Sequence, residues 1–411
     1  MKVLVYPHSM EIGGSQINAV ELAGAVRNRG HDVAVFGGPG PLRATVETLD
    51  LRVVEAPPVG RRPSPARALA LVDAVRDGDF DLVHAYEWPP TLEATYGPHA
   101  WCSTPVVSTV LSMAVAPFLP RHLPLVVGTE QIRSACTATG RVRVHLIEPP
   151  VDTVDNAPRP RPEAFAARWR VAPGVPVVVV VSRLAHELKR TGLLEAMTAV
   201  AALPSSWGAR LLVVGDGDAR TELQQRAAAV NLGAGREVVT LTGALLDPRA
   251  AYALADVVLG MGSSILRGMA FAKAAVVQGE AGFWEAVTPE SLPTFLRQGW
   301  YGHGGGGAVR LTGILAELLA DRGRLVGLGS LSRDLVVSRF SLDRAAALQE
   351  QVYAGALTGG CTGGRTGALV RSFAGLVVYK ARRRRDRSRG RAATDDFNAL
   401  PPPPVVVGQL G

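Results

Sequence analysis

Apolar and polar positions in the first half of the chain follow two alternating patterns. Short apolar runs, such as KVLVYP at residues 2–7 and DVAVFGG at 32–38, are typical of buried strands. Between them, residues 13–30 carry an apolar stripe at helical spacing that ends at a glycine, which predicts a helix. Further apolar runs predict strands at Arg52–Ala56, Leu82–Tyr86, Val106–Val110, Leu125–Gly128 and Val144–Ile147. Strands that alternate with helices indicate a parallel sheet.

The same alternation begins again with five consecutive valines at residues 177–181. A helix is predicted at 188–202. The apolar runs that follow, with helical segments between them, occupy residues 209–214, 237–243, 255–260 and 274–279. Strands this apolar are expected in sheets that helices cover on both faces. The two series therefore predict an α/β protein of two doubly wound, Rossmann-like domains.

A linker is predicted where the first series ends, because the segment EPPVDTVDNAPRPRP from Glu148 is rich in proline and polar residues. We expect an N-terminal domain at 1–150 and a second domain at 151–340. A helix at 341–358 is expected to return to the N-terminal domain. Residues 359–411 are rich in glycine, arginine and proline and are expected to form a disordered, mobile basic tail.

The positive charge of the chain is concentrated near its C-terminus. The formal net charge is +8, from 44 basic and 36 acidic residues. Residues 361–411 hold ten basic and three acidic residues, so that segment alone accounts for most of the excess. Because the rest of the chain is nearly neutral, the total charge does not indicate a nucleic-acid partner.

Neither a membrane span nor a cysteine-based site is indicated. No apolar run reaches the roughly 18 residues that cross a bilayer, and the start MKVLVYPHSM turns polar too early for a secretory signal. We therefore expect a cytoplasmic protein. Cys102, Cys136 and Cys361 are far apart in sequence, which favours neither a disulfide framework nor a zinc site.

Two cations follow the valine run, at Arg183 and Lys189. The carboxyl ends of strands in open α/β sheets are where ligands bind, so the two cations are candidates for holding an anion. The alternative is that Arg183 caps the sheet and that Lys189 is a solvated residue of the next helix.

Several segments, in this order, resemble the family 4 glycosyltransferases of the GT-B fold: GGSQ at 13–16, SRLAHELKR at 182–190, VVGDGDARTEL at 213–223, AYALADVVL at 251–259 and GMAFAKAAVVQGEAGFWE at 268–285. The resemblance covers roughly residues 1–355. It implies two Rossmann-like domains that face each other across a cleft, with the acceptor on the N-terminal domain and a nucleotide sugar on the C-terminal one.

The implied activity is transfer of a sugar, of the hexosyltransferase kind, from a nucleoside-diphosphate sugar to a small-molecule or lipid-linked acceptor. The resemblance further implies retention of configuration, no metal, and no cofactor besides the nucleotide sugar as co-substrate. Fixed cations suit this chemistry, because cleavage places negative charge on the departing diphosphate.

Residues for donor binding follow from the resemblance. They are Arg183 and Lys189 for the diphosphate, together with Gly215, Gly217 and Gly282. The sequence DGD at 216–218 raises the alternative of a metal site, but its place between an apolar strand and a helix favours a nucleotide turn.

One segment departs from the family. The family carries two glutamates seven residues apart after the strand that corresponds to ADVVLG, and the second holds the ribose. Here the loop is shorter, and Arg267 occupies the place of the second glutamate. Arginine binds phosphate but cannot accept hydrogen bonds from hydroxyls. Either Ser263, Ser264 and Arg267 hold the diphosphate, or donor binding is lost. Alternatives are therefore a catalytically degenerate nucleotide-sugar-binding protein and a GT-B nucleotide-sugar epimerase.

Candidates for the reacting centre are His84, Glu280 and Glu285, of which Glu285 matches the family's GG-x-x-E glutamate. His84 ends a predicted strand and can orient hydroxyls or move a proton, but it can equally be a buried, hydrogen-bonded structural residue. Glu280 and Glu285 can face the sugar or be solvated.

Candidates for the acceptor side are Glu87, at the end of the same strand as His84, and the loop residues Gly13, Gly14, Ser15 and Gln16. The glycines leave backbone N–H groups free at the start of a helix. The alternative is a tight strand-to-helix turn that Ser15 caps.

The C-terminal segment also raises a membrane hypothesis. Residues 368–379 are mostly apolar, and KARRRRDRSRGR follows directly. Such a segment is expected either to contact an anionic membrane peripherally or to be a disordered basic tail.

Overall fold

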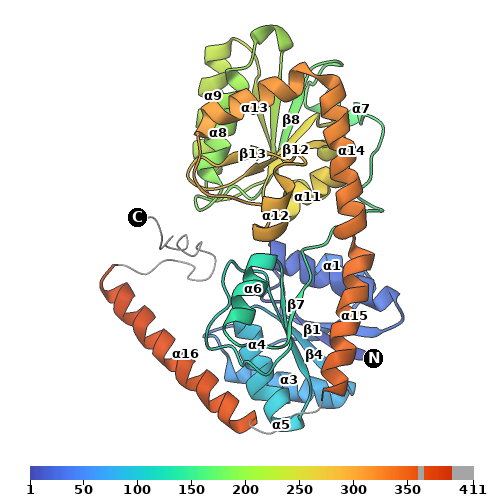
Figure 1. The fold of residues 1–411 in the computed structure, drawn as a ribbon, viewed down its shortest axis with the longest axis vertical. Helices are drawn as coiled ribbons and strands as arrows, with labels where there is room; N and C mark the ends of the chain where they lie inside the picture. Colours follow the sequence, from blue (N-terminus) through green and yellow to red (C-terminus); the bar gives the residue numbers. More distant parts are fainter. Residues whose placement is uncertain (360–364, 391–411) are drawn as a thin grey trace, which may run out of the picture. The chain divides into compact units, whose positions relative to one another are not determined.

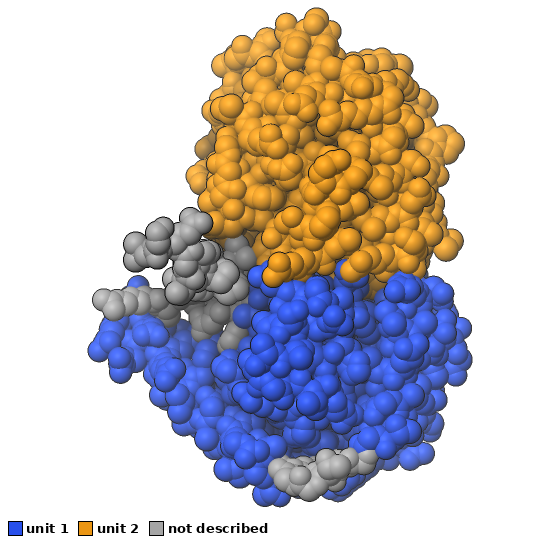
Figure 2. Space-filling view, viewed as in Figure 1, with its two compact units in different colours: residues 1–148, 343–411 blue, residues 149–342 orange. Residues whose placement is uncertain are grey.

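The computed structural model describes residues 1–359 and 365–390, which form two compact units (Figure 2). Unit 1 comprises Met1–Glu148 and the described residues from Asp343 onward, and unit 2 comprises Pro149–Leu342. Each unit contains one β-sheet of mainly parallel strands. The predicted α/β class with two doubly wound, Rossmann-like domains is confirmed.

The sheet of unit 1 has seven parallel strands in the order β3-β2-β1-β4-β5-β6-β7. The strands are β1 (Lys2–Tyr6), β2 (Asp32–Gly37), β3 (Arg52–Glu55), β4 (Leu82–Tyr86), β5 (Val106–Val110), β6 (Leu125–Val127) and β7 (Val144–Leu146). The chain proceeds from β1 to β3 on one side and resumes with β4 on the other side of β1. Ligands of doubly wound sheets bind at such a reversal, outside the carboxyl ends of the strands.

The helical segments of unit 1 are α1 (Gly14–Asn28), α2 (Arg43–Thr48), α3 (Pro65–Gly78), α4 (Trp88–Ala94), the π-helical turn η1 (Thr95–His99), α5 (Ala100–Cys102), α6 (Glu130–Ala138), α15 (Leu342–Thr358) and α16 (Arg365–Ser388). Helix α15 contacts the N-terminal part of the unit through Glu350, whose carboxylate accepts one hydrogen bond from Arg29 and lies 2.6 Å from His31 Nε2. Its Tyr353 reaches His84 of β4, although the two residues are 269 positions apart in sequence.

The sheet of unit 2 has six strands in the order β10-β9-β8-β11-β12-β13. The strands are β8 (Val177–Val181), β9 (Arg210–Val214), β10 (Val239–Gly243), β11 (Val257–Gly260), β12 (Ala274–Gln278) and β13 (Trp284–Ala286). All pairs are parallel except β12 with β13. The antiparallel strand β13 was not predicted, because its three residues are too few to show a period. The strand order reverses between β8 and β11.

The helical segments of unit 2 are α7 (Glu163–Arg168), α8 (Arg190–Ala201), the 3-10 turn η2 (Ser205–Trp207), α9 (Arg220–Ala234), α10 (Arg249–Leu254), α11 (Ser263–Ala270), α12 (Leu292–Gln298), α13 (Gly307–Ala320) and α14 (Arg322–Arg339). Figure 1 shows them around the sheet of this unit. The predicted helix at 188–202 is confirmed as α8, which begins two residues later.

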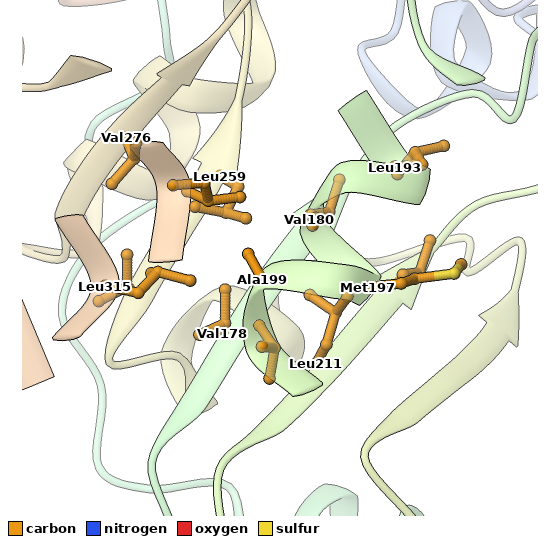
Figure 3. Packing of buried hydrophobic residues seen from close by; sticks show 14 of the residues in the cluster. Val178, Val180, Leu193, Met197, Ala199, Leu211, Leu259, Val276 and Leu315 are labelled. Carbon is orange, nitrogen blue, oxygen red and sulfur yellow. The ribbon is translucent and has the colours of Figure 1, made fainter. Parts of the chain in front are cut away.

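The five valines of β8 explain how the sheet of unit 2 is held between its helices. Val178 and Val180 pack in the cluster drawn in Figure 3, with side chains from α8 and α13. Val177 and Val179 pack in a second cluster, with side chains from α10 and α11. Because successive side chains of a strand point to opposite faces, an uninterrupted apolar run is required where both faces are covered.

The prediction of a disordered tail is wrong for residues 365–388, which form the 24-residue helix α16. Leu376 is buried in one cluster with Phe118, and the Ser372 hydroxyl donates a hydrogen bond of 2.7 Å to the Phe118 carbonyl. A Cβ atom at Gly375 would lie 3.0 Å from Phe118 Cβ, so the glycine that weakens the helix also allows this close contact. The rest of the predicted tail, at 360–364 and 391–411, lies outside the described residues.

Candidate functional site

The predicted donor residues of unit 2 lie at the carboxyl ends of four neighbouring strands. Gly215 follows β9, Arg183 is two residues beyond β8, Ser263 is three beyond β11, and Glu280 is two beyond β12. These strands are consecutive in the sheet, in the order β9-β8-β11-β12. Neighbouring strands are about 5 Å apart. The structure therefore gathers residues from four separate sequence segments along one edge, on both sides of the reversal between β8 and β11.

Arg183 and Lys189 occupy the loop between β8 and α8. Arg183 is exposed, and Lys189 is half-buried directly before α8. Within the described part of the chain, neither the Arg183 guanidinium nor the Lys189 ammonium forms a hydrogen bond or ion pair with the protein. The adjacent Arg190, in contrast, is paired with Glu222. The loop thus presents two cations that no side chain of the described residues pairs with.

Burial and the nearby charge of Arg183 lower the pKa of Lys189 to about 8. Both effects disfavour the charged ammonium, because one removes water and the other adds a like charge. An anion bound between the two side chains would reverse this effect. The pair is therefore suited to a phosphate group and unsuited to a cationic ligand.

The glycine turn after β9 supports the loop that carries Arg183. Gly215 and Gly217 have φ angles of +147° and +157°. A Cβ atom at Gly215 would lie 1.8 Å from the Ser182 carbonyl oxygen, and one at Gly217 would lie 2.4 Å from that of Leu184. The Leu184 N–H donates to the Asp216 carbonyl at 2.9 Å. The glycines therefore admit the protein's own backbone, which fixes the arginine loop.

Gln278 also supports the cationic loop, and sequence reasoning missed it. It ends β12, is 1% exposed, and places its Nε2 3.5 Å from the Leu188 carbonyl oxygen and 3.4 Å from that of Lys189. A polar residue at the end of the apolar run AAVVQG was the available signal. Its partners, about ninety positions earlier in the chain, could not be identified from the sequence.

Ser263, Ser264 and Arg267 lie on α11, which begins after Gly262 at the carboxyl end of β11. The Ser264 hydroxyl donates to the Met261 carbonyl at 2.9 Å, so it serves the turn. Arg267 is half-buried on the same short helix, and its charge acts on Tyr252. Since β11 pairs with β8, the start of α11 and the loop of Arg183 are neighbours at the sheet edge.

Asp216 of the DGD segment is arranged as a turn residue. Asp216 accepts a hydrogen bond of 2.6 Å from Arg220 and another of 2.8 Å from the Gly217 N–H. Among the described residues, no group of three or more histidine, cysteine or acidic side chains is arranged to hold a metal ion. The carboxylate of Asp216 is thus already used within its own turn.

Glu280 and Glu285 differ in their surroundings. The Glu280 backbone bridges to His303, and no described side chain forms a hydrogen bond or ion pair with its carboxylate. Gly282, with φ of +80°, accepts a hydrogen bond from the Gly307 N–H and so closes the loop. Glu285 lies on β13 and is paired with Arg310 at 3.1 Å. Of these two glutamates, Glu280 is therefore the one whose carboxylate has no partner in the part of the chain that the structure describes.

In unit 1, Glu87 joins the ends of β4 and β5 to the start of α1. Its carboxylate accepts hydrogen bonds from the Ser15 hydroxyl at 3.0 Å, the Leu111 N–H at 3.0 Å and the Ser112 hydroxyl at 2.7 Å. Glu87 is 6% exposed and has a φ of +67°, which is strained for a residue with a side chain. Burial raises its pKa, and the three donors act against that rise. The structure thus brings the predicted residues Ser15 and Glu87 together.

The GGSQ loop forms a turn without the predicted serine cap. Gly13, in extended conformation, occupies the N-cap position of α1, and Gly14 is exposed at the first helical position. Ser15 is instead bound to Glu87, and Gln16 donates to the Ser9 hydroxyl at 3.3 Å. First-turn amides of a helix have no partner within the helix, so Gly14 leaves its N–H available at this edge.

His84 lies inside unit 1 rather than at its surface. It is 1% exposed, with Nδ1 2.7 Å from the Tyr353 hydroxyl and Nε2 2.7 Å from the Thr109 hydroxyl. Burial lowers its pKa to about 3, so the ring is neutral at physiological pH. This arrangement favours the alternative of a buried structural histidine, and the reason is a contact with α15 that the local sequence does not indicate.

Two family profiles match the chain in overlapping segments. Residues 12–188 match the profile described as Glycosyltransferase Family 4, and residues 175–298 match the one described as Glycosyl transferases group 1. Together they extend across the sheet edges of both units. No curated protein sequence matches the chain.

Solved structures with a similar fold include a glycosyltransferase from Rickettsia africae, at 15% identity and a TM-score of 0.69, which covers 87% of this chain and 99% of its own. HepE of Anabaena in complex with UDP-glucose has 17% identity and a TM-score of 0.67, covering 86% and 100% of the two chains. Sucrose-phosphate synthase of Thermosynechococcus elongatus has 16% identity and a TM-score of 0.64, covering 86% and 98%. At these identities the likeness concerns the fold.

Proposed function

The chain is a GT-B glycosyltransferase that resembles family 4, and from this premise we propose that it transfers a sugar from a nucleoside-diphosphate sugar to an acceptor, with retention of configuration and without a metal. The proposal includes no cofactor besides the nucleotide sugar, and a cytoplasmic location. HepE was solved with UDP and with UDP-glucose, which makes uridine donors the first to test here.

The observation that carries this proposal is the pair of uncompensated cations at the carboxyl end of β8. Arg183 and Lys189 have no protein partner among the described residues, while the neighbouring Arg190 does. At an effective dielectric constant of about 20, a cation about 4 Å from an anion gains about 4 kcal/mol before desolvation is subtracted. Negative charge grows on the diphosphate as the glycosidic bond breaks, so this gain is larger in the transition state.

On unit 2, the diphosphate would bind to Arg183 and Lys189, with the start of α11 beside them. Glu280, whose carboxylate has no described protein partner, would accept hydrogen bonds from the transferred sugar. On unit 1, we assign Glu87 and the exposed start of α1 to the acceptor side. We assign no proton transfer to His84, because both of its ring nitrogens are already in contact with hydroxyl groups.

A panel of nucleoside-diphosphate sugars, incubated with and without candidate acceptors, tests the function. Released nucleoside diphosphate is measured for the parent chain, for Arg183→Ala and Lys189→Ala, and for Arg344→Ala, an exposed arginine of α15, as control. We expect acceptor-dependent release that each of the first two variants lowers by about 100-fold or more, as for removal of an oxyanion donor. Parental rates in both variants would contradict the assigned site.

A second candidate, a degenerate protein that binds the nucleotide sugar without turnover, is favoured by one observation. Arg267 stands where the family has its ribose-binding glutamate, and Glu285 is paired with Arg310. Binding of nucleoside diphosphate without release from any donor would favour this candidate. A new epimer formed without acceptor would instead favour the epimerase.

Arg267 gives a direct test of how the donor is held. If Arg267 binds the diphosphate, Arg267→Ala should weaken binding of UDP about tenfold and leave uridine binding nearly unchanged, because a charged hydrogen bond contributes about 1.5–3 kcal/mol. Arg267→Glu, which restores the family residue, should weaken UDP further by placing an anion beside an anion. Tighter UDP binding by Arg267→Glu would show that Arg267 does not hold the diphosphate.

A further inference from the structure

Helix α16 packs one of its faces against the N-terminal part of unit 1, where it contacts α4, η1 and the segment around Phe118. The Tyr379 ring lies 5.1 Å from the ring of Phe118 and 6.2 Å from that of Trp88, measured between centroids. The Ser372 hydroxyl lies 3.0 Å from the Tyr96 hydroxyl. Trp88 directly follows Glu87 in sequence, so this helix is anchored beside the proposed acceptor side.

The opposite face of α16 is apolar and exposed. Val370, Phe373, Val377 and Val378 are 63%, 59%, 50% and 49% exposed. The Phe373 ring also lies 6.3 Å from the Tyr96 ring, so this residue borders the packed face. With 3.6 residues per turn, positions 370, 377 and 381 lie on one side of the helix and positions 372, 376 and 379 on the other. Large apolar side chains thus face outward over several turns, where a helix that serves only to cover unit 1 would carry polar residues.

The same helix continues into a dense basic segment. Its last turns contain four consecutive arginines, Arg382 to Arg385, of which only Arg383 is partly covered. Lys380 has its pKa lowered by burial and by the charges of Arg384 and Arg61. Arg61 belongs to the loop before α3, so the positive patch extends from α16 onto the body of unit 1.

We propose that α16 binds an anionic membrane surface, with its exposed apolar face among the lipid headgroups and its arginines paired with lipid phosphates. An exposed apolar stripe bordered by arginine complements such a surface in both polarity and charge. Among the described residues, no helix is both long and apolar enough to cross a bilayer, so the contact is interfacial. The patch is positive throughout apart from Asp386, so the same patches of two copies would repel each other if they met face to face.

The proposal also concerns the acceptor, and this part rests on the proposed function. Since α16 is anchored through Trp88, directly beside Glu87, docking of the helix would hold the acceptor edge of unit 1 close to the membrane. The acceptor class that fits is a lipid-linked molecule whose reacting hydroxyl lies at the headgroup level.

Sedimentation with vesicles tests the docking surface without donor or acceptor. The full chain is mixed at low salt with vesicles of phosphatidylcholine alone, or with about one third phosphatidylglycerol. We expect binding only to the anionic vesicles. The double variant Val370→Ser/Val377→Ser should lower the partition coefficient about tenfold through lost apolar burial. Its control is Leu232→Ser/Val309→Ser, two residues of unit 2 that are 85% and 83% exposed.

The charge contribution is tested separately. Arg384→Ser/Arg385→Ser should lower binding about fivefold for each arginine, and added salt should reduce the difference. Its control is Arg322→Ser/Arg344→Ser, on exposed positions of α14 and α15. Circular dichroism and Tm identify any variant that fails to fold. If the apolar variant fails to fold, the charge variant alone tests membrane binding, because its replaced side chains are exposed.

Several outcomes would overturn the proposal: no binding of the parent chain to anionic vesicles, equal binding by parent and both variants, or binding that appears only when residues 391–411 are removed. A dimer that the serine substitutions dissociate, without vesicle binding, would assign the face to a second copy. We expect Arg183→Ala to bind vesicles at the parental level even though its donor turnover is lost. This result would show that membrane binding does not depend on the proposed function.

Discussion

The Lys189 ammonium lies at a sheet edge where the protein supplies a second cation and no described counter-charge. Its pKa of about 8 in the unliganded chain means that the group is mostly charged at pH 7 and mostly neutral at pH 9. Charge at this position is therefore maintained at neutral pH against the effects of burial and Arg183. A bound diphosphate would compensate it.

We expect the affinity for UDP to fall as the pH rises from 7 to 9, because the neutral amine can no longer pair with phosphate. Lys189→Ala should bind UDP about tenfold more weakly at pH 7 and show no such fall, since its titrating group is gone. Titration calorimetry across this range measures both effects. Lys2→Ala, a half-buried lysine of unit 1 whose ammonium lies 3.9 Å from Asp79, is the control and should retain the parental pH dependence. A parental pH profile in Lys189→Ala would contradict the assignment.

His84 is predicted to make the folded chain sensitive to acid. Its folded pKa of about 3 lies below the value of 6.5 for an unperturbed histidine, so between these pH values the unfolded chain binds a proton that the folded chain does not. The free energy of unfolding should therefore fall as the pH drops below 6.5, by up to about 1.4 kcal/mol per pH unit from this group.

Urea unfolding of the parent and of His84→Gln at pH 7, 6 and 5 tests this prediction. The variant should be less stable at pH 7, because a contact with Tyr353 is altered, and should lose less stability on acidification. His303→Gln, at an exposed position, is the control and should follow the parent. Parallel curves for parent and His84→Gln would show that His84 does not titrate on unfolding.

At the scale of elements, the β9–α9 turn and the β8–α8 loop behave as one structural unit. Backbone hydrogen bonds of 2.9 to 3.0 Å join them at Ser182, Leu184 and Ala219, and the two glycines of the turn leave room only for the neighbouring backbone. Arg183 is consequently held by an element from a different part of the sequence. Substitutions in the turn should therefore shift the loop that carries Arg183 and weaken anion binding there.

Gly217→Ala is expected to weaken UDP binding about tenfold and to destabilise the fold by about 1–3 kcal/mol, since the added methyl group would meet the Leu184 carbonyl at 2.4 Å in a conformation that favours glycine. Calorimetric titration and urea unfolding measure the two quantities. Gly233→Ala, in α9 with open space around it, is the matched control and should raise stability slightly. Unchanged UDP affinity in Gly217→Ala would show that the turn does not position the arginine loop.

At the scale of the whole molecule, the proposed donor site offers side-chain cations, and no described carboxylate cluster is arranged to hold a metal there. Asp216 is bound to Arg220 and to a backbone N–H, and the Glu280 carboxylate has no partner among the described residues. We therefore expect sugar transfer to continue at the parental rate in excess EDTA. Turnover measured after chelation, and again after Mg²⁺ or Mn²⁺ is added back, checks this. Complete loss that either ion restores would contradict metal independence.

Most of the secondary structure and the sheet edge that carries the candidate site residues could be predicted from the sequence, because both depend on local pattern. The period of apolar residues locates strands such as β8, and a parallel sheet sends the residue after each strand to the same edge. Arg183 and Lys189 could therefore be selected as candidates from their position alone. Helix α16 could not be predicted in this way, because it packs against Phe118, a contact that the local sequence pattern does not reveal.

The sequence by itself determined the α/β class, the two doubly wound sheets and the segments that meet at their edges, since strand and helix periods are properties of neighbouring residues. Only the tertiary structure decided which polar side chains at these edges have hydrogen-bond partners and which have none among the described residues. His84 is held by Tyr353, 269 positions away, Glu87 by Ser15, 72 positions away, and Lys189 by no described side chain. The physical reason is that hydrogen bonds and burial depend on distance in space, which the order of residues does not specify until the chain has folded.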